Sequence, residues 1–365
     1  NVETTRHLTG PRTKPKTTRP STHTHIELDN NMGQAWTTEN IPDLTDRRIL
    51  VTGSNRGLGY ATVVELAKKG CEVVMTARTM EKGNKAADAI RKLVPDAKLH
   101  VLELDLSTLA SVRSFAKQFN KKFKSLNGLI NNAGIAATTD MAYIETEDEL
   151  ELVWQTNYYA PFLLTNLLMD KLVASGTTDV PSRVVMISSV THAHKRNNID
   201  PSVGLERIGK KSKERKKCYE YPATKLADLM FSTTLHRKIQ ENSDYVGKVL
   251  SVCAHPGFSS TDMTGGMGAI TNGLFGMDAS QGCLSQVRAC CDPSVESGEY
   301  IGPNTSYYGL QHVLGPVFMS STSPINELYG NPVLDATRSE YSKDERIGNE
   351  LWAAAEEATG ATFEL

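Results

Sequence analysis

Short apolar runs alternate with segments of helical periodicity from residue 48 to the end of the chain. Most of the apolar runs are continuous and rich in β-branched side chains, as is typical of strands covered on both faces; they span 49–52, 72–76, 100–104, 128–131, 184–188 and 249–254. Helix-like segments lie between them, for example at 58–69, 82–93 and 109–123. This alternation predicts an α/β fold, a doubly wound parallel sheet with helices on both sides.

The pattern continues without a linker or a second glycine-rich loop, which predicts one domain over residues 36–365. A last short strand is expected near 298–302 and a closing helix at 349–358. Residues 1–35 differ in composition, because the first 25 hold five Lys or Arg, one Glu and many Thr and Pro. Such a segment cannot build a core. It fits equally the remnant of a basic transit peptide, a disordered tail or an arm that binds a partner.

Composition narrows the class of protein. The net charge of −2 lacks the basic excess of nucleic-acid-binding proteins, and no run of eighteen apolar residues predicts a membrane span. The cysteines form no CxxC pair and have no regular spacing to His, so we expect neither a metal site nor a disulfide framework. Reduced thiols suit an intracellular compartment, either the cytoplasm or an organelle (mitochondrion or plastid). The six are Cys71, Cys218, Cys253, Cys283, Cys290 and Cys291.

The stretch VTGSNRGLG, residues 51–59, sets three glycines between the first predicted strand and the first helix. In that position a loop can place backbone N–H groups around a dinucleotide phosphate. We expect Gly53 to allow the turn, Gly57 to admit the pyrophosphate and Gly59 to let the helix pack on the strand. The spacing is GxxxGxG and not GxGxxG, so the loop alone fits a structural turn equally well.

The charge at the end of the second strand bears on the cofactor. An NAD site usually carries Asp or Glu there, bonded to the ribose 2′-hydroxyl. In this chain VVMTAR ends in Arg78, and Arg56 lies inside the glycine loop. A lone arginine is more often a solvated surface charge, but two guanidiniums at these positions suit a 2′-phosphate. The sequence therefore favours NADP(H) over NAD.

The segment YPATK places Tyr221 and Lys225 four residues apart, on one face of a helix. Free tyrosine has a pKa of about 10, too high for a base at neutral pH. A neighbouring ammonium favours the phenolate, so Tyr221 can exchange a proton with a carbonyl or alcohol oxygen. The alternative is an ordinary amphipathic helix with an exposed lysine.

Several motifs follow the glycine loop in order: NNAG at 131–134, ISS at 187–189, YPATK at 221–225 and HPGFSST at 255–261. On these motifs the chain, from about Trp36 to the closing helix, resembles the short-chain dehydrogenase/reductase family, whose Rossmann domain transfers hydride to and from a nicotinamide cofactor. The resemblance implies that Tyr221 is the catalytic acid and base. It implies that Lys225 lowers the pKa of Tyr221 and also binds the cofactor ribose. It implies that Ser189, with Ser188 as the neighbouring candidate, orients the substrate oxygen.

The resemblance also assigns Asn157, in WQTNYYAPF, to a water-holding role in a proton relay; taken alone, this residue fits a helix-surface amide. His255 precedes Pro256, but the catalytic roles are filled and we expect it to pack. The implied cofactor-binding residues comprise the glycine loop, the end of the second strand, an adenine contact, a ribose wall, the catalytic pair and a segment beside the carboxamide. They are Gly53, Ser54, Asn55, Arg56, Gly57, Leu58, Gly59, Arg78, Asp105, Leu106, Asn132, Ala133, Gly134, Tyr221, Lys225, Pro256, Gly257 and Thr261.

Thirty-one residues separate Ser189 from Tyr221, more than in the shortest family members. This insertion, with AWTTENIPDLTDRRILVTG and ELWAAAEEATG, resembles the retinol-dehydrogenase-like branch and implies a hydrophobic carbonyl or alcohol substrate that is retinoid-, steroid- or fatty-aldehyde-like. Residues 195–217 hold nine Lys or Arg against three acids. They suit contact with an anionic membrane surface or an acidic partner, and equally a solvated loop.

The sequence is therefore interpreted as an NADP(H)-dependent oxidoreductase acting on CH–OH and C=O groups. The alternative is a non-catalytic NADP-binding subunit of a larger assembly, with the basic extension and insertion as contact surfaces. The four catalytic side chains favour the enzyme, because a scaffold has no need of them. Family members commonly pair through their long helices, so a homodimer and a subunit of a larger complex both stay open.

Overall fold

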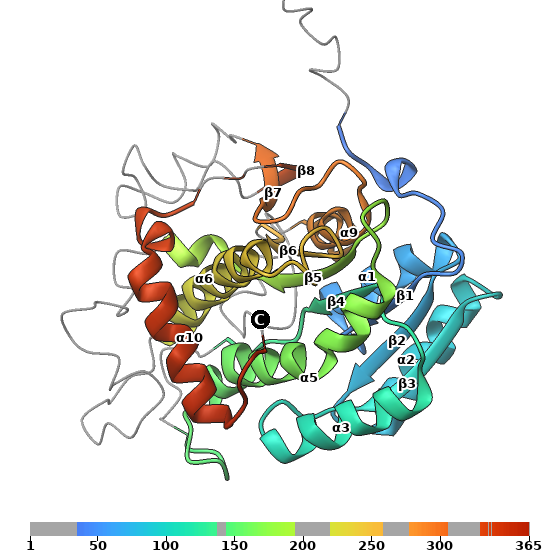
Figure 1. Cartoon of the computed structure of the whole chain (residues 1–365). Helices are drawn as coiled ribbons and strands as arrows, with labels where there is room; N and C mark the ends of the chain where they lie inside the picture. Colours follow the sequence, from blue (N-terminus) through green and yellow to red (C-terminus); the bar gives the residue numbers. More distant parts are fainter. Residues whose placement is uncertain are drawn as a thin grey trace, which may run out of the picture. The chain divides into compact units, whose positions relative to one another are not determined.

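Eight strands form one sheet within the residues that the computed structural model describes, namely 35–136, 144–193, 220–257, 277–305 and 329–364 apart from 335 and 337. Their order across the sheet is β3-β2-β1-β4-β5-β6-β7-β8 (Figure 1). The strands are β1 Arg48–Val51, β2 Glu72–Ala77, β3 Lys98–Glu103, β4 Gly128–Asn131, β5 Ser182–Ile187, β6 Val249–Ala254, β7 Tyr300–Thr305 and β8 Tyr329–Val333.

The strands from β3 to β7 all run parallel, which confirms the predicted doubly wound sheet. The six strands predicted from apolar runs begin and end within two residues of the observed ones. Their continuous apolar character follows from burial on both faces; every residue of β4 and β5 is buried. The sheet is mostly parallel rather than wholly so, because β8 pairs antiparallel with β7.

Two layers of helices cover the sheet. One hydrophobic cluster joins the sheet to α3, α5, α6 and α10, and the other joins it to α1, α2 and α9. Helix bounds are α1 Gly57–Lys68, α2 Met80–Leu93, α3 Leu109–Lys122, α4 Leu152–Trp154, α5 Ala160–Ser175, α6 Glu220–Glu241, α8 Ala279–Gly282, α9 Leu284–Cys291 and α10 Glu345–Thr359; single turns are η1 Thr38–Asn40, η2 Gln155–Tyr159, η3 Val190–Ala193 and η10 Glu340–Lys343.

The closing helix α10 lies against α6 (Figure 1). Trp352 and, beyond the helix, Phe363 pack with Phe162 of α5 and Phe231 of α6, all four rings being buried. Aromatic contacts of this kind add stability beyond the apolar area that they bury. The C-terminal segment therefore seals the α5–α6 side of the core.

Five of the six cysteines lie within the described residues. Cys71, Cys253, Cys283, Cys290 and Cys291 are buried and form no disulfide with one another; Cys218 lies outside the described residues. None of the described helices has the length and apolar character needed to cross a membrane.

Candidate active site

The loops after β1 and β4 meet where the strand order changes direction, because β1 lies between β2 and β4. Ligands of doubly wound sheets bind at such a point, outside the carboxyl ends of the strands. The two loops are bonded together: Asn132 Nδ2 donates to the Thr52 carbonyl (2.8 Å), and the Ala133 N–H donates to Thr52 Oγ1 (2.9 Å). Asn132 and Ala133 therefore tie the loop after β4 to the end of β1; their expected place beside the ribose stays a prediction.

The glycine loop needs glycine at Gly53 and Gly59 for different reasons. Gly53 has φ of 61°, in the left-handed region that other residues rarely adopt. A Cβ on Gly59 would lie 2.6 Å from the Gly53 carbonyl oxygen and 2.5 Å from Asn132 Nδ2. The turn predicted at Gly53 is thus present, and Gly59 lets the start of α1 lie close against the loops after β1 and β4.

The N-terminus of α1 offers a place for an anion. Arg56 precedes it with no side-chain capping bond, and the first turn carries no acidic residue. The positive end of the helix dipole and the first-turn N–H groups suit a phosphate. Asn55 and Leu58 lie half-buried beside this turn. Ser54 instead anchors the loop to β2, since its N–H donates to the Thr76 carbonyl and its hydroxyl accepts from the Thr76 N–H, both at 3.0 Å.

Both predicted arginines are exposed at the carboxyl end of the sheet. Arg56 stands at the start of α1, and Arg78 follows directly after β2. The residue after Arg78 is Thr79, which caps α2 through its side chain. An NAD-type acid is therefore missing from this end of β2, and a guanidinium stands there.

The adenine-side residues follow β3. Asp105 Oδ1 accepts hydrogen bonds from the Ser107 N–H (2.9 Å) and hydroxyl (2.7 Å), so this carboxylate shapes its own loop. Leu106 is buried in the hydrophobic cluster. Their expected contact with adenine stays a prediction.

Asn157 is 2% exposed and lies in the middle of η2, a five-residue π turn between α4 and α5. Its Oδ1 accepts from the Ile135 N–H (2.9 Å), while its Nδ2 donates to the Ile135 carbonyl (3.0 Å) and to Thr224 Oγ1 (3.0 Å). The helix-surface alternative for Asn157 is therefore wrong. The amide ties the NNAG loop to α6, and π turns often occur at functional sites.

Lys225 is buried and held by two hydrogen bonds. Its Nζ donates to the Ile187 carbonyl and to Asp228 Oδ2, both at 2.7 Å. Burial alone would lower the pKa of Lys225, but the charge of Asp228, the charge of Tyr221 and the hydrogen bond to Asp228 together outweigh burial, and the pKa lies above its ordinary value. The exposed-lysine alternative for the YPATK helix is wrong. A Cβ on Gly134 would lie 3.3 Å from Asn157 Oδ1 and 3.6 Å from Lys225 Nζ, which places these three residues together.

Tyr221 lies half-buried on the same helix, with Lys225 Nζ 5.7 Å from the centre of its ring. The two serines after β5 differ. The Ser188 hydroxyl is buried and donates to the Lys225 carbonyl (2.6 Å), whereas Ser189 is half-buried and its hydroxyl accepts a long bond from the Thr191 N–H (3.3 Å). Of the two hydroxyls, that of Ser189 donates to no protein group within the described residues, and its expected contact with a substrate stays a prediction.

The segment after β6 is described as far as Gly257. His255 is buried against the ring of Tyr300, and its Nδ1 accepts from the Gly257 N–H (3.3 Å), in keeping with a packing role. Pro256 and Gly257 follow the carboxyl end of β6. Thr261 and the basic stretch 195–217 lie outside the described residues.

Three residues of the site escaped prediction. Thr224 joins Asn157 to the catalytic helix, because its hydroxyl also donates to the Tyr221 carbonyl (2.9 Å). Asp228 pairs with Lys225 at a separation of three residues, a helical spacing that the sequence could have signalled. Gln286 Nε2 donates to Asn132 Oδ1 (3.1 Å) from 154 residues away, and no local signal points to it.

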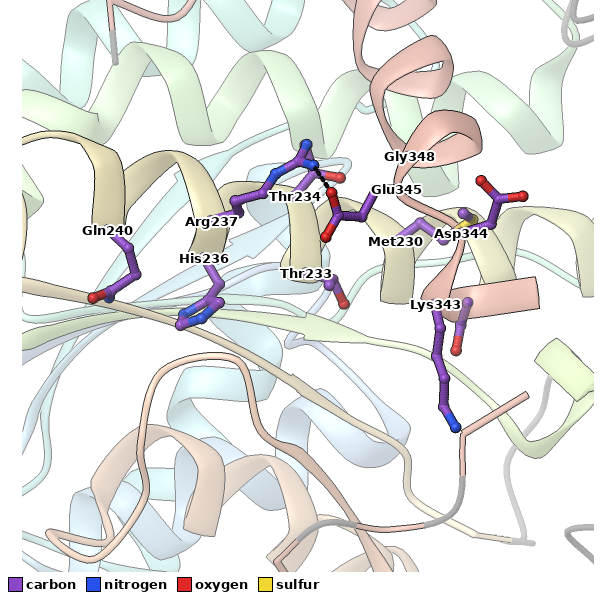
Figure 2. A pocket seen from close by; sticks show the side chains of 11 residues that line it. Met230, Thr233, Thr234, His236, Arg237, Gln240, Lys343, Asp344, Glu345 and Gly348 are labelled. Carbon is purple, nitrogen blue, oxygen red and sulfur yellow. Dashed lines mark hydrogen bonds and ion pairs between the residues drawn. The ribbon is translucent and has the colours of Figure 1, made fainter. Parts of the chain in front are cut away.

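A cavity of about 280 Å³ lies elsewhere, between α6 and the start of α10 (Figure 2). Arg237 and Glu345 line it and form an ion pair at 2.7 Å. It contains none of the predicted site residues. The described residues contain no group of three or more His, Cys, Asp or Glu able to hold a metal ion.

Known proteins resemble this chain in both sequence and fold. The model of the short chain dehydrogenase family matches residues 47–199. Short-chain dehydrogenase/reductase drtF of Aspergillus calidoustus is 35% identical, over 61% of this chain and 70% of the relative. Retinol dehydrogenase 13 of Homo sapiens is 29% identical, over 86% of this chain and 85% of the relative. The crystal structure of an uncharacterized protein from Mycobacterium paratuberculosis is 28% identical with a TM-score of 0.67, over 91% of this chain and 100% of that one.

The matched region contains the glycine loop, NNAG and both serines, and the longer match to the human relative extends over most of the chain. The parallel sheet with its switch point between β1 and β4 is the arrangement that the motifs imply. The chain belongs to the short-chain dehydrogenase/reductase family of nicotinamide-dependent oxidoreductases, in its retinol-dehydrogenase-like branch.

Proposed function

We propose that this protein transfers hydride between NADP(H) and a hydrophobic carbonyl/alcohol pair, with Tyr221 as the proton donor and acceptor. The observation that carries the proposal is the meeting of the NNAG loop, Asn157 and Lys225 beside Tyr221. These residues come from three separate segments, the NNAG loop, η2 and α6, and buried or part-buried hydrogen bonds fix their places. A scaffold that only used the fold would gain nothing from this arrangement.

The chain's own residues fit a dinucleotide. The uncapped N-terminus of α1 suits the pyrophosphate. Lys225 has three N–H donors and uses two of them on protein oxygens, which leaves one for a ribose hydroxyl. Arg78, with Arg56 near the same edge, supports a 2′-phosphate because guanidinium groups bind phosphate in bidentate fashion.

The nicotinamide supplies or accepts the hydride. Tyr221 donates its phenolic proton to the substrate oxygen during reduction and takes it back during oxidation. Lys225 carries positive charge close to that phenol and so stabilises the phenolate. Ser189 donates a hydrogen bond to the same oxygen and orients it, while Asn157 keeps the NNAG loop and α6 in register.

The proposed substrate class follows from membership of the retinol-dehydrogenase-like branch. Human retinol dehydrogenase 13, a relative by sequence, has a name that specifies a long apolar alcohol. We infer a hydrophobic aldehyde, ketone or alcohol for this chain.

The test is NADPH oxidation by the purified protein with retinal and a panel of apolar aldehydes and ketones. Tyr221→Phe removes only the hydroxyl, so turnover should fall by about 10²-fold or more while NADPH binding stays within about twofold of the parent. Arg78→Ala should weaken NADPH binding by about tenfold and leave NADH binding nearly unchanged. NADPH binding with no turnover on any substrate, and no effect of Tyr221→Phe, would favour the non-catalytic subunit instead.

A further inference from the structure

Asp228 is a buried acid next to the catalytic pair, and the proposed mechanism does not use it. The residue is 1% exposed, and its Oδ2 lies 2.7 Å from Lys225 Nζ. Its Oδ1 is buried with no hydrogen-bond partner within the described residues. A buried carboxylate with one oxygen unpartnered lowers the stability of the fold, so its presence here calls for a functional explanation.

We propose that Asp228 is a positioning residue for the Tyr221–Lys225 pair: it fixes Lys225 Nζ against the end of β5 and offsets part of the ammonium charge that Tyr221 faces. Lys225 Nζ is held in place by two hydrogen bonds, which it donates to Asp228 of α6 and to the Ile187 carbonyl at the end of β5. The charge effect follows from Coulomb's law at low dielectric, where an anion 2.7 Å from a cation weakens its field on a third group.

The surroundings leave Asp228 with one strong partner. Besides Lys225 on α6, the described titratable groups whose charges interact with that of Asp228 are Tyr158 of η2 and Cys253 of β6, both buried. Burial raises the pKa of both and keeps them uncharged at neutral pH. His192 of η3, which packs on α6, is bonded to the Ser189 carbonyl and to the Tyr300 hydroxyl. Lys225 is therefore the cation through which Asp228 acts.

Burial raises the pKa of Asp228 to about 6, even though Lys225 opposes this shift. The carboxylate is thus ionised in neutral solution and becomes protonated in mild acid. Loss of its negative charge should leave the Lys225 ammonium less compensated and so increase the phenolate fraction of Tyr221. The proposal rests on the proposed function for its catalytic meaning, but the charge relationship can be measured without nucleotide or substrate.

The experiment is a spectroscopic titration of tyrosinate in the full chain without nucleotide. Asp228→Asn keeps the shape and an oxygen acceptor for Nζ but removes the charge. Each protein is also titrated with Tyr221→Phe added, and the difference isolates Tyr221. We expect Asp228→Asn to move this difference curve toward acid by about one pH unit, a tenfold rise in phenolate at a given pH. An unmoved curve, or a shift toward alkali, would overturn the proposal.

The matched control is Asp88→Asn. Asp88 also pairs with a basic residue three positions away, Arg91, but it lies on α2 with its side chain 69% exposed, and its loss should leave the curve in place. A cycle with Lys225→Met covers the case in which Asp228→Asn fails to fold, because neutralising both partners of a buried pair is better tolerated than removing one. Because Asp228 offsets only part of the ammonium charge, Lys225→Met/Asp228→Asn should titrate at higher pH than the parent. A curve that coincides with the parent's, or lies toward acid of it, contradicts the proposal.

Turnover gives an independent reading. The pH profile of alcohol oxidation should move toward acid in Asp228→Asn by the same amount as the tyrosinate curve. If Tyr221→Phe proves to have no effect on turnover, the proposed function fails while the tyrosinate result still decides the role of Asp228.

Discussion

Trp352 of α10 stacks on Phe231 of α6, with ring planes 10° apart and centroids 5.4 Å apart. Phe363 contacts Trp352 at 4.7 Å and Phe162 at 5.0 Å, measured between ring centroids, so the segment after α10 completes an aromatic cluster against α6. Phe231 lies on the same helix as Tyr221 and Lys225, so this packing holds in place the helix that carries both residues.

Trp352→Ala should lower the free energy of unfolding by about 3–5 kcal/mol, since it removes a buried ring and leaves a cavity. Chemical denaturation measures the loss. Leu93→Ala, at a side chain that is 63% exposed, is the control and should change stability by less than about 0.5 kcal/mol. Equal losses in the two variants would mean that α10 does not stabilise the core.

Gly59→Ala should impair nucleotide binding more than folding. The new Cβ would come within 3 Å of the Gly53 carbonyl and Asn132 Nδ2, so the glycine loop must move. We expect NADPH affinity to fall by about tenfold or more, which corresponds to overpacking of about 1–3 kcal/mol expressed at the loop. Fluorescence titration with NADPH measures it.

Gly348→Ala is the comparison for that variant, because its Cβ would meet one hydroxyl, Thr234 Oγ1, where α10 packs on α6, and neither residue belongs to the predicted nucleotide site. It should change stability without changing NADPH affinity. If Gly59→Ala binds NADPH as the parent does, the glycine loop is a structural turn and nothing more.

Asn157→Ala should reduce turnover and stability together. It deletes both bonds to Ile135 and the bond to Thr224, leaving the half-buried N–H and carbonyl of Ile135 unpaired at a cost of about 1–3 kcal/mol. Melting and steady-state kinetics report the two effects. Asn120→Ala loses a single exposed amide bond to the Leu167 carbonyl and should be nearly neutral in both.

Glu72 should make part of the stability dependent on pH. Burial alone would raise its pKa, but bonds to Arg48 and His100, both at 2.7 Å, lower it below its ordinary value of 4.5. A carboxyl with a depressed folded-state pKa stabilises the fold above its unfolded pKa, and that contribution is lost as pH falls through the folded value. Glu72→Gln should therefore reduce stability near pH 7 by about 1 kcal/mol and flatten the decline below about pH 4.5.

Urea unfolding between about pH 3 and pH 7 checks this expectation. Glu241→Gln, at an exposed position at the end of α6, should keep the acid decline unchanged. A Glu72→Gln curve that runs parallel to the parent over the whole pH range would rule out Glu72 as a source of the loss of stability in acid.

The parallel strands could be predicted because each is buried on both faces, and so its apolar character is continuous and local. The strand β8 could not, because YGNPV contains Gly, Asn and Pro, which weaken strand propensity. Its place at the sheet edge, antiparallel to β7, comes from tertiary pairing that no local pattern encodes.

The same distinction holds for the candidate site, where some residues carry a local sequence signal and others do not. Tyr221 and Lys225 could be found from helical spacing, and Gly53 and Gly59 from their place between strand and helix. The buried state of Asn157 could not, since WQTNYY has no periodicity that distinguishes a helix surface from a π turn. Gln286 reaches Asn132 across 154 residues, so only the folded chain brings these two amides together.

The π turn at Gln155–Tyr159 makes the position of Asn157 a matter of residue count. The Ala160 N–H bonds to the Gln155 carbonyl, five residues back, where an ordinary helix would reach four. Removing one residue from this turn would restore the ordinary helix and rotate Asn157 by about 100° relative to α5, because each residue accounts for that angle at 3.6 residues per turn. A deletion of one codon in this turn would thus displace Asn157 and abolish activity although every predicted catalytic side chain is still encoded. The catalytic motifs alone would not reveal such a defect.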